Sequence, residues 1–232
     1  TVGKSLEALK IPVIYVDFET PDQYKRDLAI LGKVFQNESR AKQAVDYYQN
    51  KVAEIQSALQ GVSSKPRVLM LYYSDKDGAV AFNVPPLAWM QTQIVQLAGG
   101  EPVWASANPG SGWTKVSLEQ VAAWDADMIF IISYNKNSSE VVAGLKTNTQ
   151  WQALRAVKAG RLYAFPGDLY SWDQPDARWI LGLTWLSARL HPEQFSKMDI
   201  VQQSKQFYET LYGLDGQFFD KNIRPTFKGD LP

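Results

Sequence analysis

The sequence contains no cysteine and only one histidine, His191. The missing thiols exclude disulfides, thiolate metal sites and cysteine nucleophiles, and one imidazole falls short of the several nitrogen ligands typical of a zinc centre. A metal would therefore need carboxylates, tyrosines or a small molecule that brings its own donor atoms. We interpret His191, which precedes Pro192, as a helix-terminus residue rather than a catalytic base. The absence of cysteine also fits an oxidising compartment outside the cytoplasm.

An excess of charge of either sign and long apolar runs are missing as well. Lysine plus arginine and aspartate plus glutamate both number 24, so the formal net charge is zero. This balance gives no indication of a nucleic-acid surface, and no stretch approaches the roughly 20 apolar residues of a transmembrane helix. Residues 1–4 lack the basic and apolar regions of a signal peptide, and we interpret them as the middle of a domain.

Motifs that carry catalysis are not found either. The run Gly110-Ser111-Gly112 has neither the remaining glycines of a dinucleotide fingerprint nor the lysine of a phosphate-binding loop. No serine lies in a nucleophile-elbow pattern. Asp125 and Asp127 are neighbouring acids in a turn before a predicted strand, where carboxylates are usually solvated. The residues give no support for an enzyme, and we predict that the protein is not one.

What the sequence does contain is an alternation of strands and helices. Short apolar runs predict strands over 12–17, 67–73, 102–104, 128–133 and 161–165. Start and stop residues predict helices over 85–100, from 117, over 151–159, and from 176 onward with breaks at 191–192 and 213. Strands that alternate with helices predict an α/β fold with a mostly parallel sheet flanked by helices.

A long helix is predicted over 38–60, ahead of the main run of strands. Its apolar positions recur at spacings of three and four, and Gly61 is a natural stop. Such a helix would be about 33 Å long. Two interpretations remain open for it: a helix that spans between two parts of the molecule, or a long surface helix that covers one face of a sheet.

Aromatic residues gather where the predicted strands end. Ligands of open parallel sheets bind at the carboxyl ends of the strands, and tyrosine or tryptophan in a loop is costly to expose unless something packs on it. We predict a rim that faces a flat, polarisable ligand, with an arginine to hold a carboxylate, catecholate or oxyanion. The predicted ligand-binding residues are Tyr73, Trp113, Tyr134, Tyr170, Trp172 and Arg178. The alternative is that some of these aromatics pack the edge of their own sheet.

The order of these segments resembles a known family. The motifs, in order, are the strand at 12–16, the long helix, the strand at 67–69, Leu97-Ala98-Gly99-Gly100, the run 116–121, the strand at 125–130, Gly160-Arg161-Leu162-Tyr163, and the stretches 171–175, 181–186 and 191–193. Together they resemble the periplasmic binding proteins of ABC importers that carry vitamin B12, ferric siderophores, haem or molybdate. The stretch from Ser171 onward is similar to the iron-complex and oxyanion branch of that family.

The resemblance implies a domain organisation and partners. Residues 1–18 would be a remnant of an amino-terminal lobe, residues 19–61 a helical region whose helix 38–60 joins two lobes, and residues 62–232 the carboxy-terminal α/β lobe. Glu119 matches the family's glutamate that docks on the membrane permease. The family also implies a location in the periplasm or, as a lipoprotein, on the cell surface.

Three functions are carried forward as hypotheses. The first is capture of a metal chelate, a ferric siderophore before others, with molybdate or tungstate as the second choice of ligand, and with no cofactor or protein-bound metal. The second is an α/β enzyme or cofactor carrier that acts on a small metabolite. The third is an interaction module whose aromatics line a partner surface.

Overall fold

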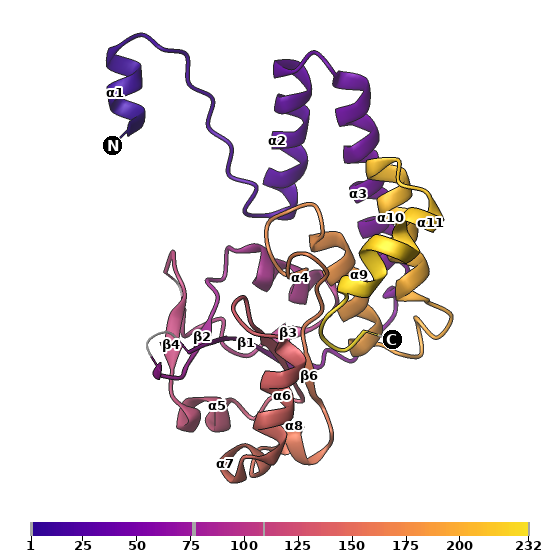
Figure 1. Cartoon of the computed structure of the whole chain (residues 1–232). Coiled ribbons are helices and arrows are strands. Elements are labelled where there is room, and N and C mark those ends of the chain that lie inside the picture. Colours follow the sequence, from indigo (N-terminus) through magenta and orange to yellow (C-terminus); the bar gives the residue numbers. More distant parts are fainter. Residues whose placement is uncertain (1, 76–77, 109, 232) are drawn as a thin grey trace.

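A mixed β-sheet forms the centre of the structure, a computed structural model that describes residues 2–75, 78–108 and 110–231 (Figure 1). Within these residues the strand order is β4-β2-β1-β5-β6, with β3 paired to the first residues of β1. The strands are β1 (Arg67–Ser74), β2 (Ala81–Val84), β3 (Glu101–Pro102), β4 (Thr114–Val116), β5 (Met128–Ile132) and β6 (Leu162–Ala164). Helices surround this sheet, which confirms the predicted α/β class.

The centre of the sheet is parallel, as predicted. β5 pairs in parallel with β1 on one side and with β6 on the other. Every residue of β5 is buried, and so are Val68 to Leu71 in β1. Strands that are apolar on both faces are stable only where both faces are covered, so these two strands fix the layered architecture.

The strands β2 and β4 were not predicted, and they make the sheet mixed. β2 runs antiparallel to β1, and β4 runs antiparallel to β2. Each has only three or four residues, and a run that short gives too little alternation to recognise. They extend the sheet beyond β1, next to the start of α5 (Leu118–Trp124).

The predicted helices lie near the observed ones, with several differences. The helix predicted over 85–100 covers only Met90–Leu97, and the helix Ser138–Thr147 was not predicted. The segment 151–159 is not one helix: Leu154 takes an extended conformation (ψ 138°) between two short helices. Among the described residues, every helix is too short or too polar to cross a lipid bilayer. The remaining helices are α1 (Val2–Ala8), α2 (Pro21–Val34), α3 (Glu38–Ala58), α4 (Met90–Leu97), α6 (Ser138–Thr147), α7 (Thr149–Gln152), α8 (Arg155–Lys158), α9 (Trp179–Leu190), α10 (Ile200–Tyr212) and α11 (Gly216–Phe218).

The predicted long helix is α3, and it lies beside α2 on one side of the sheet-containing part (Figure 1). Its contact with α9 is aromatic: the rings of Tyr48 and Trp179 stack at 5.3 Å with an interplanar angle of 14°. The Tyr48 hydroxyl donates to the carbonyl oxygen of Ala177 at 2.8 Å. A stacked and hydrogen-bonded tyrosine that is fully buried fixes the direction in which α3 leaves the sheet.

The strand predicted over 12–17 is wrong. The segment is extended, but no described strand lies beside it, and Ile14 and Tyr15 are 56% and 64% exposed. A β-strand needs a neighbour to pair its backbone groups, and the apolar pattern alone does not supply one. The segment is tied down at its end, where the buried Asp27 carboxylate accepts hydrogen bonds from the backbone N–H groups of Asp17 and Phe18.

Candidate ligand-binding site

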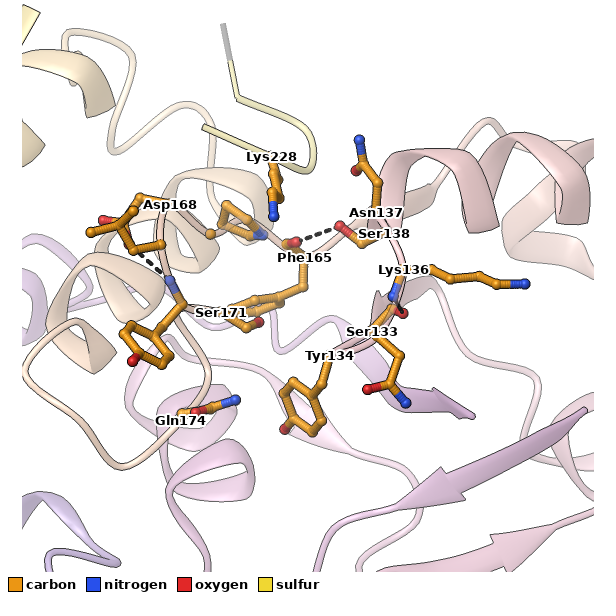
Figure 2. Close-up of a pocket in the computed structure, with 15 residues that line it drawn as sticks. Ser133, Tyr134, Lys136, Asn137, Ser138, Phe165, Asp168, Ser171, Gln174 and Lys228 are labelled. Carbon is orange, nitrogen blue, oxygen red and sulfur yellow. Dashed lines mark hydrogen bonds between the residues drawn. The ribbon is translucent and has the colours of Figure 1, made fainter. Parts of the chain in front are cut away.

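A pocket of about 310 Å³ opens at the carboxyl ends of β5 and β6 (Figure 2). One wall is the loop after β5, residues 133–138, and the other is the loop after β6, residues 165–174. The carboxyl ends of parallel strands meet at one edge of a sheet, so the topology itself brings these two loops together. We call them the first rim loop and the second rim loop.

The pocket is lined mainly by hydroxyl and amide groups. The Ser138 hydroxyl donates to the carbonyl oxygen of Phe165 at 2.9 Å, which joins the two rim loops at the floor. Lys228, from the end of the chain, pairs through its backbone with Gly167, and Figure 2 shows its amine directed between the two loops. Lys136 points away from the pocket in the same view and forms an ion pair with Asp75. The pocket therefore combines the Lys228 amine with neutral hydrogen-bonding groups and with Asp168, whose carboxylate is paired with Arg178.

An aromatic surface lies next to the pocket, and we call it the aromatic shelf. It consists of Tyr72, Trp89, Trp113 and Tyr134, all partly exposed. The Tyr72 ring lies 4.7 Å from that of Tyr134 and 5.2 Å from that of Trp113, and Trp89 meets Trp113 edge-on at 5.8 Å. These distances are those of rings in mutual contact, so the shelf is a continuous surface rather than a cage. Tyr134 belongs to both the shelf and the pocket.

A buried carboxylate lies beneath the shelf. Asp173 is fully buried and accepts hydrogen bonds from the Tyr134 hydroxyl at 2.6 Å, from the Gln91 side-chain amide at 3.2 Å and from the Ser171 hydroxyl. Burial raises the pKa of Asp173, and the three donors oppose that shift. Burial and the nearby Asp173 also raise the pKa of Tyr134 well above its usual range, so this side chain remains a neutral phenol.

A second buried carboxylate on the same loop has a cation for its partner. Asp168 lies 2.7 Å from the Arg178 guanidinium, and it also accepts a hydrogen bond from the Tyr208 hydroxyl. Arg178 in turn pairs with Asp176 and donates to Tyr208. This ion pair fixes the second rim loop to α9 and α10.

The structure brings some of the predicted site residues together. Tyr134 and Tyr170 line the pocket, and Trp113 lies on the aromatic shelf. Tyr170 is 60% exposed, with the Arg178 guanidinium 5.3 Å from its ring centre. Their contact with a ligand stays a prediction.

The structure places the other three predicted residues outside the lining of the pocket. Trp172 is fully buried, its ring packs against that of Phe227, and its backbone N–H donates to the Pro166 carbonyl oxygen, so its ring does not reach the surface of the described part of the chain. Arg178 is not a free fork, since its guanidinium is already paired with Asp168. Tyr73 points to the face of the sheet opposite the shelf and packs on Phe82 at 5.8 Å.

The residue that replaces Tyr73 on the shelf is its neighbour Tyr72. Successive side chains of a strand point to opposite faces of the sheet, so a shift of one residue moves the predicted side chain to the other face. Because β1 is apolar on both sides, the sequence pattern could not make that choice. Lys228 was also missed, since nothing in the sequence connects it with Gly167.

Glu119 lies in the first turn of α5 and is exposed. A hydrogen bond from Ser117, the residue that caps this helix, lowers the pKa of Glu119. Val116, at the end of β4, pairs with Phe82, which in turn pairs with Tyr73. This register places the start of α5 at the same edge of the sheet as the pocket, and a docking role for Glu119 stays a prediction.

His191 lies outside this site. It is the residue after the last turn of α9, as predicted, and it is buried beside Gly99. Burial lowers its pKa. No group of three or more histidine, aspartate or glutamate side chains arranged to hold a metal occurs in the described part of the chain.

Comparisons with known proteins agree with this architecture. The family described as periplasmic binding protein matches residues 4–169. A vitamin B12-binding protein of Pectobacterium atrosepticum is 26% identical over 133 residues, which are 55% of this chain and 45% of that protein. The chain thus spans less than half of the length of this curated relative.

Two solved structures show the same fold. A periplasmic solute-binding protein from Veillonella parvula superposes with a TM-score of 0.73 and 24% identity, covering 96% of this chain and 67% of that one. The molybdate periplasmic binding protein of Haemophilus influenzae, solved with molybdate bound, gives a TM-score of 0.71 and 19% identity, covering 91% and 68%. All three relatives are binding proteins rather than enzymes. With more than half of its residues matched by the family, this chain belongs to the periplasmic binding protein family.

Proposed function

We propose that the chain is part of the extracytoplasmic solute-binding component of an ABC importer, and that its ligand is a metal chelate, a ferric siderophore before others. The observation that supports this most strongly is the aromatic shelf beside the polar pocket, with Tyr134 shared by both. A chelate has flat apolar faces that stack on aromatic rings and polar edges that accept hydrogen bonds. Such a ligand brings its own metal donors, so it makes no demand on histidine or cysteine.

A second candidate is an oxyanion, and a different set of contacts favours it. The pocket is rich in hydroxyl and amide donors, and the Lys228 amine is directed into it. Small oxyanions are held by such donors rather than by stacking. One relative of the same fold binds molybdate. The two candidates therefore make opposite demands on the shelf and on Lys228.

The organisation of the chain is a further part of this proposal. Residues 62–232 would form one lobe of the binding protein, α3 would connect it to a second lobe, and residues 1–18 would belong to that second lobe. The exposure of Ile14 and Tyr15, at 56% and 64%, supports this assignment, since a second lobe would cover these apolar side chains.

A panel of candidate ligands tests the proposal directly. The chain would be heated with ferric catecholates, ferric hydroxamates, haem, cobalamin, molybdate and tungstate. A ligand at a hundredfold over its Kd adds about 2.7 kcal/mol, which raises the melting temperature of a chain this size by roughly 5–10 °C. We expect such a shift with a ferric chelate. If no compound shifts the melting temperature, the proposed function fails for this chain.

Two variants separate the two candidates. Trp113→Ala removes the centre of the shelf and should lower the affinity for a ferric chelate by about fivefold or more, with molybdate binding unchanged. Lys228→Ala should weaken molybdate and leave the chelate largely unaffected. A ligand whose affinity falls in Lys228→Ala and not in Trp113→Ala would favour the oxyanion.

Delivery to a membrane permease is assigned to Glu119. Glu119→Ala in the complete binding protein should leave ligand affinity intact and reduce uptake, because Glu119 does not line the pocket and matches the glutamate by which the family docks on its permease. Glu140, exposed in the first turn of α6, is the matched control, and Glu140→Ala should leave uptake unchanged. An equal loss of ligand affinity in Glu119→Ala would contradict the docking role.

A further inference from the structure

Asp173 is a buried carboxylate without a cation. No lysine or arginine of the described residues lies within ion-pair distance of it, and all of its hydrogen-bond donors are neutral. Taking a carboxylate out of water costs several kcal/mol unless other groups compensate. On the same loop, the charge of Asp168 is compensated by an ion pair with Arg178. A packed neutral side chain would avoid the cost at position 173, so the charge needs another explanation.

The donors to Asp173 come from separate parts of the chain that meet at the site. Gln91 lies on α4, Tyr134 on the first rim loop and Ser171 on the second. A carboxylate can accept several hydrogen bonds at once, so this single group holds all three segments in register. The Gln91 side-chain oxygen, in contrast, has no partner among the described residues. Asp173, not Gln91, is therefore the centre of the network.

Tyr134 is the member of this network that reaches the ligand side. The residue is 36% exposed, its ring packs on Tyr72, and its hydroxyl donates to Asp173 at 2.6 Å. A phenol has one proton to donate, so this hydroxyl has none left for a ligand. The raised pKa of Tyr134 acts in the same direction, because a tyrosine must lose its proton to coordinate a metal as phenolate.

We propose that Asp173 is a positioning residue of the ligand site: it fixes the Tyr134 hydroxyl, so that Tyr134 meets the ligand with its ring and its oxygen is withheld from the ligand's metal. The inference rests on the proposed function, since it assumes a metal chelate on the shelf. It adds the manner of recognition, which is stacking and not coordination. It also makes Asp173 important for affinity although its buried side chain cannot touch a ligand.

The first test needs no ligand. The chain is labelled with 3-fluorotyrosine, and the fluorine NMR signal of Tyr134 is identified by its loss in Tyr134→Phe. In Asp173→Asn this signal should shift, because a charged acceptor has been replaced by a neutral one. The signal of Tyr163, whose ring stacks on Phe130 away from the site, should stay in place. An unchanged Tyr134 signal would overturn the inference.

The second test uses a ferric tris-catecholate complex, with tryptophan fluorescence as the measure of binding. Asp173→Asn and Tyr134→Phe should each raise the Kd by about fivefold, and the double variant should be no weaker than either single one, because both remove the same bond. Effects that multiply would show that the two residues act independently and would overturn the inference. If Asp173→Asn does not fold, Tyr134→Phe still reports on the bond from its other end.

A ferric bis-catecholate complex, which leaves coordination positions on the iron open, tests the role of the oxygen. Bound to the wild type and to Tyr134→Phe, it should show the same visible spectrum. A tyrosinate-to-iron charge-transfer band that is lost in Tyr134→Phe would contradict the proposal. If the wild type binds neither ferric complex, the proposed function fails, whereas the NMR measurement still decides whether Asp173 fixes Tyr134.

Discussion

The second rim loop carries two buried carboxylates that differ in their partners. Asp168 pairs with Arg178 at 2.7 Å and is anchored to α10 through Tyr208. Asp173 has only neutral donors, and one of them is the hydroxyl of Tyr134, a residue that lines the pocket. The first arrangement neutralises a charge and holds the loop, while the second leaves a charge in place beneath the aromatic shelf.

The difference separates a structural group from one that serves the site. Breaking a buried ion pair leaves an uncompensated charge, so the cost appears in stability. Removing a buried carboxylate that has no cation also removes the desolvation cost of its charge. The effect of such a substitution is therefore expected in the positions of the groups that the carboxylate held. The same residue type on one loop thus acts in two ways, and the partner decides which.

The largest effect is expected from removing the cation. Arg178→Ala should lower the free energy of unfolding by about 3–5 kcal/mol, since Asp168 is left charged and fully buried. Urea denaturation measures the loss. Arg155 is a matched control because it also contacts two carboxylates, Asp125 and Asp127, but its side chain is 49% exposed. Arg155→Ala should lower the free energy of unfolding by at most about 1 kcal/mol. Equal losses in the two variants would show that burial is not the cause of the larger loss expected for Arg178→Ala.

A smaller loss of stability is expected from removing the hydroxyl of Tyr208, which bonds to both members of the ion pair. Tyr208→Phe removes the bond that its hydroxyl donates to Asp168 and the one that it accepts from Arg178. Hydrogen bonds to charged groups are worth about 1.5–3 kcal/mol each, and Arg178 remains to neutralise Asp168, so we expect a loss of about 2 kcal/mol. Ligand affinity should not change.

Tyr163→Phe is the control for Tyr208→Phe. The Tyr163 hydroxyl has no hydrogen-bond partner in the described part of the chain, and its ring stacks on Phe130. Its removal should alter the free energy of unfolding by less than about 0.5 kcal/mol. A fall in ligand affinity in Tyr208→Phe would show that the ion pair, too, positions the site.

The sequence predicted the parts of the fold that have strong local patterns. β1, β5 and α3 each carry a continuous or periodic apolar signal, and all three were found at their predicted places. The strand at 12–17 has the same kind of signal but no neighbour, and it did not form. Apolar pattern therefore identifies a segment that can be a strand, and pairing decides whether it becomes one.

The candidate site was predicted as a region and not residue by residue. Topology placed the rim loops at the carboxyl ends of the strands, which is a general property of parallel sheets. The fate of each aromatic depended on contacts with distant residues: Trp172 turned inward onto Phe227, and Tyr72 rather than Tyr73 faced Trp113. The network around Asp173 joins three separate segments of the chain, so no local sequence pattern predicts it.

The smallest expected effect is the contribution of Asp173 to the pH dependence of the free energy of unfolding. Because burial raises its pKa above the unfolded value of about 3.9, the folded protein holds this proton to higher pH than the unfolded chain does. Unfolding then releases a proton in that range, and stability falls as pH rises. One proton accounts for at most about 1.4 kcal/mol per pH unit. The free energy of unfolding of the wild type relative to Asp173→Asn should therefore decrease as pH rises from about 4.

Asp27 supplies the opposite sign as a control. Its pKa is lowered to about 2 by Arg26 and by the N–H groups of Asp17 and Phe18, so the unfolded chain binds this proton more tightly between about pH 2 and 4. The stability of the wild type relative to Asp27→Asn should rise with pH across that window. Both differences are read from urea denaturation at a series of pH values. If the two slopes had the same sign, Asp173 would be stabilised as a carboxylate like Asp27, and the contrast between the unpaired and the paired carboxylate of the second rim loop would be lost.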